Sequence, residues 1–304
     1  MALTSAQKAR LRQIASIENA IQSSLTNMLQ KQEPDYIARL TINLPQQLQN
    51  ALGNSYNVAG GFLHQKPLAK MLYPQNTTGK DPEIGDMLVV YKEGMRYSAL
   101  LLQAKKGSVN TVMKISSGDE HQLELYETWP EFEYRRAGIL NGKHRNVSPH
   151  IPHAGAQYLV IDESLPRPQL GCAVASRQIH VNKGFAESLY DLILFQTGRP
   201  FAPKHRGRGN QWSTMIWDLI DIAGCSKFKR KTISTLRQDR LNDPNKAFFM
   251  MCERFRGSSY FSELEKRLSR HCEEEFNQEC NGDTEDIPNG GMGVIMIEKS
   301  SVLA

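Results

Sequence analysis

Two apolar runs joined by a four-residue turn are the feature that most constrains the folding of this chain. Residues 86–91 read DMLVVY, residues 96–105 read RYSALLLQAK, and residues 92–95 form the turn between them. Valine and tyrosine favour strands, and near-continuous apolar runs are typical of strands that are covered on both faces. The segment therefore predicts a hairpin of two central, buried strands.

Polar residues stand at the open end of this hairpin. If the turn centres near residues 93–94, antiparallel partners have numbers that sum to about 188, so Asp86 lies beside Leu102 or Gln103. Gln103 and Lys105 are two residues apart and project from the same face of their strand. Burying such groups is costly unless they are paired. A divalent cation gives them a partner, because carboxylate and amide oxygens suit Mg²⁺. Lys105 is then placed to orient or deprotonate water, or to stabilise a charged phosphate.

This arrangement resembles the PD-(D/E)xK nuclease superfamily, in the variant with Gln in the last motif that is found in Mrr-type restriction endonucleases. The resemblance covers about 25 residues: PEIGD at 82–86, the hairpin, and LLLQAKK at 100–106. It implies an α/β fold, with a restriction-endonuclease-like core of a mixed central sheet flanked by helices. It also implies phosphodiester hydrolysis with Mg²⁺ or Mn²⁺. By the resemblance, Asp86 is the central metal ligand, Gln103 the second ligand and Lys105 the catalytic lysine.

A third metal ligand is less clearly marked. Members of the superfamily often carry an acidic residue on the helix before the hairpin, but residues 41–80 contain no Asp or Glu. Glu33 and Asp35 are the nearest acidic residues on the helical side. We select Glu83, three residues before Asp86, as the third ligand; the alternative is an ordinary solvated loop carboxylate.

The net charge of +5 hides a segregation of charge along the chain. Residues 199–240 contain ten Lys or Arg and three acidic residues, whereas residues 273–298 contain eight acidic residues and no Lys or Arg. A basic stretch of this kind favours contacts with a phosphate backbone; the alternative is a solvated helix face or an exposed loop. The residues that we expect to contact nucleic acid are Lys106, Lys204, Arg206, Arg208, Lys229 and Arg230. The resemblance favours DNA as the partner and leaves RNA open.

Apolar periodicity and composition organise the rest of the chain. They predict helices at 5–31, about 34–52, 121–129, 185–195 and 214–222, with more helix within 245–277. They also predict strands at 157–161, 172–175, 178–181 and 293–297, a loop at 53–61 and a loop-rich segment at 130–155. We divide the chain into an N-terminal helix (1–30), a nuclease-like core (31–225), and a mostly helical C-terminal region with an acidic tail (226–304). The core thus has helical additions at both ends.

Composition excludes several classes of protein. No apolar run approaches the length of about 18 residues that indicates a membrane span, and no apolar secretory segment follows the first methionine. The five cysteines form no CxxC pair and are typical of reduced thiols. We therefore expect a cytoplasmic protein that has no membrane partner.

The function hypothesis is a Mg²⁺-dependent endonuclease acting on DNA; a role in restriction or antiphage defence follows from the resemblance alone. Such an activity inside a cell implies a restraint, either a regulatory protein partner, homo-oligomerisation or a restricted substrate. One alternative is a non-catalytic nucleic-acid-binding or scaffold protein that keeps the nuclease fold. Another is a helical interaction protein whose hairpin is purely structural, with Asp86 and Lys105 paired across the sheet.

Overall fold

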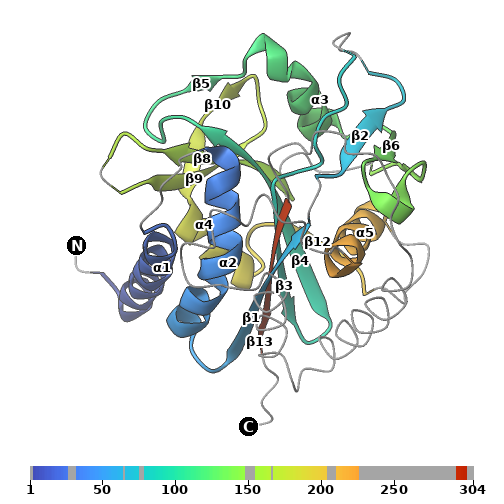
Figure 1. Ribbon diagram of the computed structural model, residues 1–304. Coiled ribbons are helices and arrows are strands. Elements are labelled where there is room, and N and C mark those ends of the chain that lie inside the picture. Colours follow the sequence, from blue (N-terminus) through green and yellow to red (C-terminus); the bar gives the residue numbers. More distant parts are fainter. Residues whose placement is uncertain are drawn as a thin grey trace, which may run out of the picture.

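The computed structural model of the protein consists of a mixed β-sheet with helices on both faces (Figure 1). The structure describes residues 3–26, 32–63, 66–74, 79–147, 155–165, 167–203, 210–225 and 292–299. The main sheet of this part contains, in spatial order, β1 (Tyr56–Leu63), β13 (Met292–Lys299), β3 (Met87–Glu93), β4 (Arg96–Lys106), β8 (Ala156–Asp162), β9 (Gln169–Val174) and β11 (Val181–Gly184). The short strand β12 (Arg199–Pro200) pairs with β4 near its start.

The predicted hairpin is confirmed as the antiparallel pair β3–β4 at the centre of this sheet. Met87 pairs with Leu102, which sets Asp86 beside Gln103 as expected. Gly94 has a φ of +56° in the turn, a conformation that glycine adopts without strain. After β4 the chain crosses over through α3 (Glu120–Thr128) and returns as β8, parallel to β4. The sheet is therefore mixed, as predicted.

Each face of β4 is buried against a different group of helices. Leu100, Leu102 and Ala104 pack on the side of α1 (Ser5–Ser24), α2 (Glu33–Leu52) and α4 (Phe185–Ile193). Ala99 and Leu101 pack on the side of α3 and α5 (Gln211–Cys225). Figure 1 shows α1 and α2 side by side, with α5 on the other side of the sheet. Burial on both faces explains why the strand is an almost unbroken apolar run.

Smaller elements surround the open end of the hairpin. They are β2 (Leu68–Met71), β6 (Phe132–Arg135) and β7 (His144–Arg145) in one small sheet, β5 (Met113–Lys114) and β10 (Gln178–Ile179) in another, and the 3₁₀ turns η1 (Ser117–Asp119) and η2 (Gly138–Leu140). The segment predicted to be loop-rich at residues 130–155 thus also contains the short strands β6 and β7.

The loop predicted at residues 53–61 is also wrong, because Tyr56–Leu63 forms β1. Gly60, within this segment, has a packing role in the structure. A Cβ at Gly60 would lie 2.2 Å from the carbonyl oxygen of Thr41 and 2.8 Å from Cγ of Pro45, both in α2. Glycine therefore allows α2 to approach the sheet closely.

The strand near the C-terminus belongs to the main sheet, although we assigned residues 226–304 to a separate C-terminal region. Residues 292–299 form β13, which pairs antiparallel with β1 and parallel with β3, so the predicted core of 31–225 lacks one strand of the sheet. Glu298, counted in the acidic tail, is buried on this strand and pairs with Lys92. The apolar run of 294–297 explains why this segment enters the sheet. Residues 226–291 lie outside the described residues.

Candidate functional site

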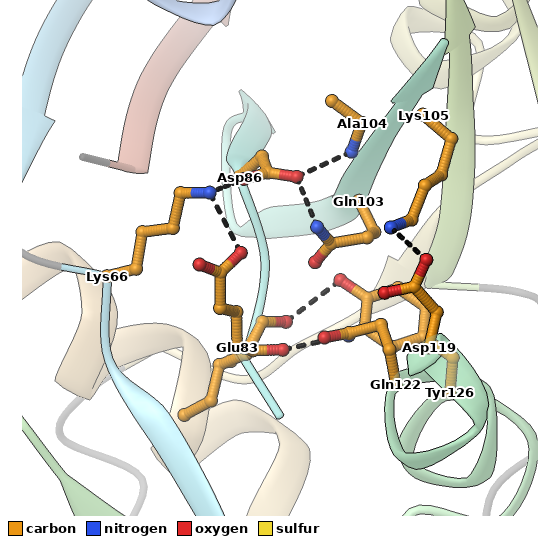
Figure 2. Close-up of polar contacts among 10 residues, drawn as sticks. Lys66, Glu83, Asp86, Gln103, Ala104, Lys105, Asp119, Gln122 and Tyr126 are labelled. Carbon is orange, nitrogen blue, oxygen red and sulfur yellow. Dashed lines mark hydrogen bonds and ion pairs between the residues drawn. The ribbon is translucent and has the colours of Figure 1, made fainter. Parts of the chain in front are cut away.

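The candidate site lies where β3 begins and β4 ends (Figure 2). The backbone N–H of Asp86 donates to the carbonyl oxygen of Leu102 at 2.8 Å, and its carbonyl accepts from the N–H of Gly293 at 2.8 Å. Asp86 is therefore fixed between two strands of the sheet just before β3. Its side chain is buried, with only 2% of the residue exposed.

The buried carboxylate of Asp86 is held by three donors. Its Oδ2 accepts hydrogen bonds from the backbone N–H of Ala104 at 2.7 Å and from Nε2 of Gln103. Its Oδ1 pairs with Nζ of Lys66 at 2.5 Å. Burial raises the pKa of Asp86 to about 6, and the positive charge of Lys66 opposes that rise. The site thus holds a carboxylate whose charge depends on a nearby cation.

Lys66 is a central residue that the sequence analysis missed. Its Nζ also lies 2.8 Å from Oε2 of Glu83, so one ammonium bridges two carboxylates. Burial lowers the pKa of Lys66, but the charges of Asp86 and Glu83 outweigh this and raise it above its usual value. A bridge between Leu68 and Glu83 brings the two segments together. No local motif signals that long-range pairing.

Helix α3 fixes the backbone that carries Glu83. Nε2 of Gln122 donates to the carbonyl oxygen of Glu83 at 2.8 Å, and the hydroxyl of Tyr126 donates to that of Ile84 at 2.8 Å. At Gly85, a Cβ would lie 2.8 Å from the Leu101 side chain and 2.9 Å from the Tyr126 hydroxyl. The loop before Asp86 is therefore closely packed against α3 and β4.

Lys105 projects from the same face of β4 as Gln103, as predicted, but pairs with a residue that the sequence analysis did not select. Its Nζ lies 3.0 Å from Oδ2 of Asp119, which also accepts from the hydroxyl of Ser116 at 3.0 Å. Burial alone would raise the pKa of Asp119; the hydrogen bond and charge of Lys105 lower it instead. Lys105 is thus held beside the cluster by Asp119, not paired with Asp86.

Unsatisfied polar atoms gather around this site. Among the described residues, the buried side-chain atoms without a hydrogen-bond partner are Oε1 of Gln103, Nδ1 of His121 and the hydroxyl of Tyr158. Tyr158 stands beside Gln103 on the neighbouring strand β8, and its ring stacks on Tyr126 with centroids 5.7 Å apart. Buried polar atoms are rarely left unpaired in folded proteins, so their grouping indicates unused capacity to bind a polar ligand.

His121, at the start of α3, lies within electrostatic range of the cluster. Burial lowers its pKa, and the charges that act on it come from Asp119, Lys80, Lys105 and Glu83. A pKa below its ordinary value leaves the imidazole mostly neutral at pH 7. No sequence motif marks this histidine, because Lys80, Lys105 and Glu83 reach it from separate segments.

The predicted nucleic-acid contacts are described only at Lys106. Its backbone N–H donates to Oε1 of Glu33 at 2.7 Å, and its Nζ lies 2.5 Å from Oε2 of Glu163. Glu33, considered as a metal ligand, therefore binds the backbone at the end of β4. The other predicted contacts, Lys204, Arg206, Arg208, Lys229 and Arg230, lie outside the described residues.

The donor atoms of the cluster suit a hard divalent cation. Asp86 and Glu83 offer carboxylate oxygens, and Gln103 offers the unsatisfied Oε1. In the described part of the chain, no group of three or more His, Cys, Asp or Glu residues is placed to hold a metal; the donor set here is two carboxylates and one amide. The residues fit Mg²⁺ or Mn²⁺ once the ammonium of Lys66 moves from between the two carboxylates.

Comparison with protein-family models, with curated proteins and with solved structures found no match. Within the described segments, no helix is both long enough and apolar enough to span a bilayer. The resemblance drawn from the hairpin therefore rests on the residues of the hairpin alone.

Proposed function

We propose that this protein is a metal-dependent nuclease that hydrolyses phosphodiester bonds of DNA and has a restriction-endonuclease-like core. The observation that carries the proposal is the convergence of Asp86, Glu83 and the unsatisfied oxygen of Gln103 at one end of a central hairpin. Lys105 projects beside them from the same strand face. Oxygen ligands next to an ammonium are a set of groups that metal-dependent hydrolysis of phosphodiester bonds can use.

Each residue has a distinct task in this proposal. Asp86, Glu83 and Gln103 hold the cation, and the N–H of Ala104 keeps the Asp86 carboxylate in place. Bound Mg²⁺ or Mn²⁺ supplies activation of water and neutralisation of phosphate charge. Lys105 places its ammonium next to the reacting phosphate, and Asp119 fixes the direction of that side chain. Because Lys105 is paired with Asp119, its ammonium is oriented before substrate binds.

The architecture also supports the proposal. A mixed central sheet lies between two groups of helices, and the site lies where β3 begins and β4 ends. Loops and segment ends next to a rigid sheet are common locations for catalytic residues. The basic stretch of residues 199–240 is proposed to contact the DNA backbone, with RNA as the other candidate polyanion.

Cleavage assays on the full chain test this function. Purified protein is incubated with plasmid, linear DNA, single-stranded DNA and RNA, in Mg²⁺, Mn²⁺ or EDTA. We expect metal-dependent cleavage that Asp86→Asn and Lys105→Ala each slow by at least about a hundredfold, while Lys70→Ala, at an exposed position on β2, retains it. Circular dichroism checks that each variant is folded. Cleavage that survives both site substitutions would rule out the assigned residues.

A non-catalytic nucleic-acid-binding protein is the second candidate. The ion pairs favour it: Lys66 neutralises Asp86 and Glu83, and Asp119 neutralises Lys105. Such mutual pairing is what a purely structural cluster would show. Binding of DNA or RNA without cleavage in any metal would select this candidate.

A further inference from the structure

Lys66 occupies the position between the two carboxylates of the candidate metal site. Its Nζ lies 2.5 Å from Oδ1 of Asp86 and 2.8 Å from Oε2 of Glu83 (Figure 2). Gln103, the third ligand in the proposed function, is bonded to the same Asp86 through Nε2. The chain therefore supplies its own cation at the centre of the donor set.

An ammonium and a divalent cation cannot share these oxygens at close range. Two positive charges a few ångströms apart repel strongly where burial limits screening by water. The Asp86 residue is only 2% exposed, and the Lys66 side chain 15%. Cation binding at Asp86 and Glu83 therefore requires the ammonium of Lys66 to leave.

We propose that Lys66 is a built-in competitor of the divalent cation, so that metal binds the site only by displacing its ammonium. The inference rests on the proposed function for the identity of the metal ligands. Lys66 then sets the metal concentration at which the site loads. By competing with the metal, Lys66 restrains a nuclease activity that would be hazardous to the cell's own DNA.

The side chain of Lys66 is suited to such an exchange. It comes from a segment outside regular secondary structure, two residues before β2. A lysine ammonium is a compact charge on a flexible four-carbon stem, which can swing away without moving the backbone. The neighbouring backbone stays anchored, because the N–H of Ile84 donates to the carbonyl oxygen of Pro67 at 2.9 Å. Displacement thus changes the side chain and leaves the loop in place.

Three variants of the full chain separate charge from packing. Lys66→Met keeps most of the apolar stem and removes the charge, whereas Lys66→Arg keeps the charge. Lys70→Met removes an exposed lysine from the adjoining strand β2 and serves as the matched control. Each protein is freed of metal with EDTA, dialysed, and titrated with Mn²⁺ by calorimetry. Melting temperature is followed against Mn²⁺ concentration in the same preparations.

We expect Lys66→Met to bind Mn²⁺ at least tenfold more tightly than the wild type. Lys66→Arg should bind no more tightly than the wild type, and Lys70→Met should match it. If Lys66→Met is less stable without metal, because two carboxylates lose their counter-ion, its melting temperature should rise more steeply with Mn²⁺ than that of the wild type. Equal or weaker binding by Lys66→Met, or no Mn²⁺ binding by any variant, would overturn the inference.

The outcomes for the inference and for the nuclease activity can be told apart. Tighter Mn²⁺ binding by Lys66→Met, with no cleavage by any variant, would support the competition and refute the nuclease. Metal-dependent cleavage with unchanged Mn²⁺ affinity in Lys66→Met would support the nuclease and refute the competition.

Discussion

Replacing Asp86 by Asn should reveal how much the buried ion pair of Asp86 with Lys66 contributes to the free energy of unfolding. Asn is the same size as Asp, but an NH₂ group, which donates hydrogen bonds, replaces one of the two carboxylate oxygens. Those hydrogens face either Nζ of Lys66 or the N–H of Ala104, both of which are donors. Breaking a buried pair by removing one partner costs about 3–5 kcal/mol. Because Lys66 keeps Glu83 and some solvent exposure, we expect about 3 kcal/mol of destabilisation, the lower end of that range.

A double-mutant cycle isolates the coupling within the pair. Asp86→Asn, Lys66→Met and the double variant are unfolded with urea in EDTA, and tryptophan fluorescence reports the free energy of unfolding. The double variant should be more stable than the sum of the single effects predicts, by about 2 kcal/mol, because neither Asp86 nor Lys66 is then left without the other. Glu83 loses Lys66 both in Lys66→Met and in the double variant, so that loss cancels in the cycle.

An exposed ion pair of the same sheet provides the control. Nζ of Lys299 lies 2.6 Å from Oε1 of Glu93, with side chains that are 41% and 37% exposed. Exposed pairs contribute about 0–1 kcal/mol, so the cycle with Glu93→Gln and Lys299→Met should give a small coupling. Coupling between Asp86 and Lys66 that is no larger than this control would refute the reasoning.

Three further predictions concern stability and pH. Tyr158→Phe removes a buried hydroxyl that has no hydrogen-bond partner. The free energy of unfolding should stay unchanged or rise by up to about 1 kcal/mol. A loss above about 1 kcal/mol in urea unfolding would show that the hydroxyl is paired. Asp162 accepts hydrogen bonds from the N–H groups of Val109 and Ser164, both at 2.9 Å, and hydrogen bonding, led by that from the Ser164 side chain, lowers its pKa to about 2. The folded pKa lies below the ordinary value of 3.8, so the ionised carboxylate favours folding above about pH 4 and this contribution is lost as pH falls towards 2. Asp162→Asn should therefore destabilise the protein by about 1–3 kcal/mol at pH 6 and by clearly less near pH 2; a difference that does not depend on pH would contradict the assignment. Gly85→Ala places a Cβ within 3 Å of two side chains and should cost about 1–3 kcal/mol in urea unfolding; unchanged stability would show that the loop before the site can yield.

Local patterns predicted the central hairpin almost to the residue. The apolar runs and the turn at Gly94 are contiguous in sequence, and they set Asp86 beside Gln103 as expected. In contrast, the prediction of a loop at 53–61 misses β1, because the glycine at position 60 serves close packing against α2 and does not mark a loop. Its partner β13 comes from the other end of the chain, and no local pattern identifies such a pairing.

The candidate site shows the same difference between local patterns and long-range contacts. Asp86, Gln103 and Lys105 come from one hairpin, so strand alternation was enough to group them. Lys66 and Asp119 reach the cluster from separate segments, and their ion pairs depend on tertiary contacts such as the bridge between Leu68 and Glu83. Sequence spacing therefore selected the residues of the hairpin but not the charges that balance them.

The most direct test of the central claim is the rate of plasmid cleavage by the wild type and by Lys105→Ala at equal concentration in Mg²⁺. Lys105 is partly exposed and pairs with Asp119 at the surface of the site, so its replacement should leave the fold intact. The account predicts that supercoiled DNA is cut by the wild type, that EDTA stops the reaction, and that Lys105→Ala is at least a hundredfold slower. Equal cleavage rates for the two proteins, or intact plasmid with the wild type in both Mg²⁺ and Mn²⁺, would contradict it.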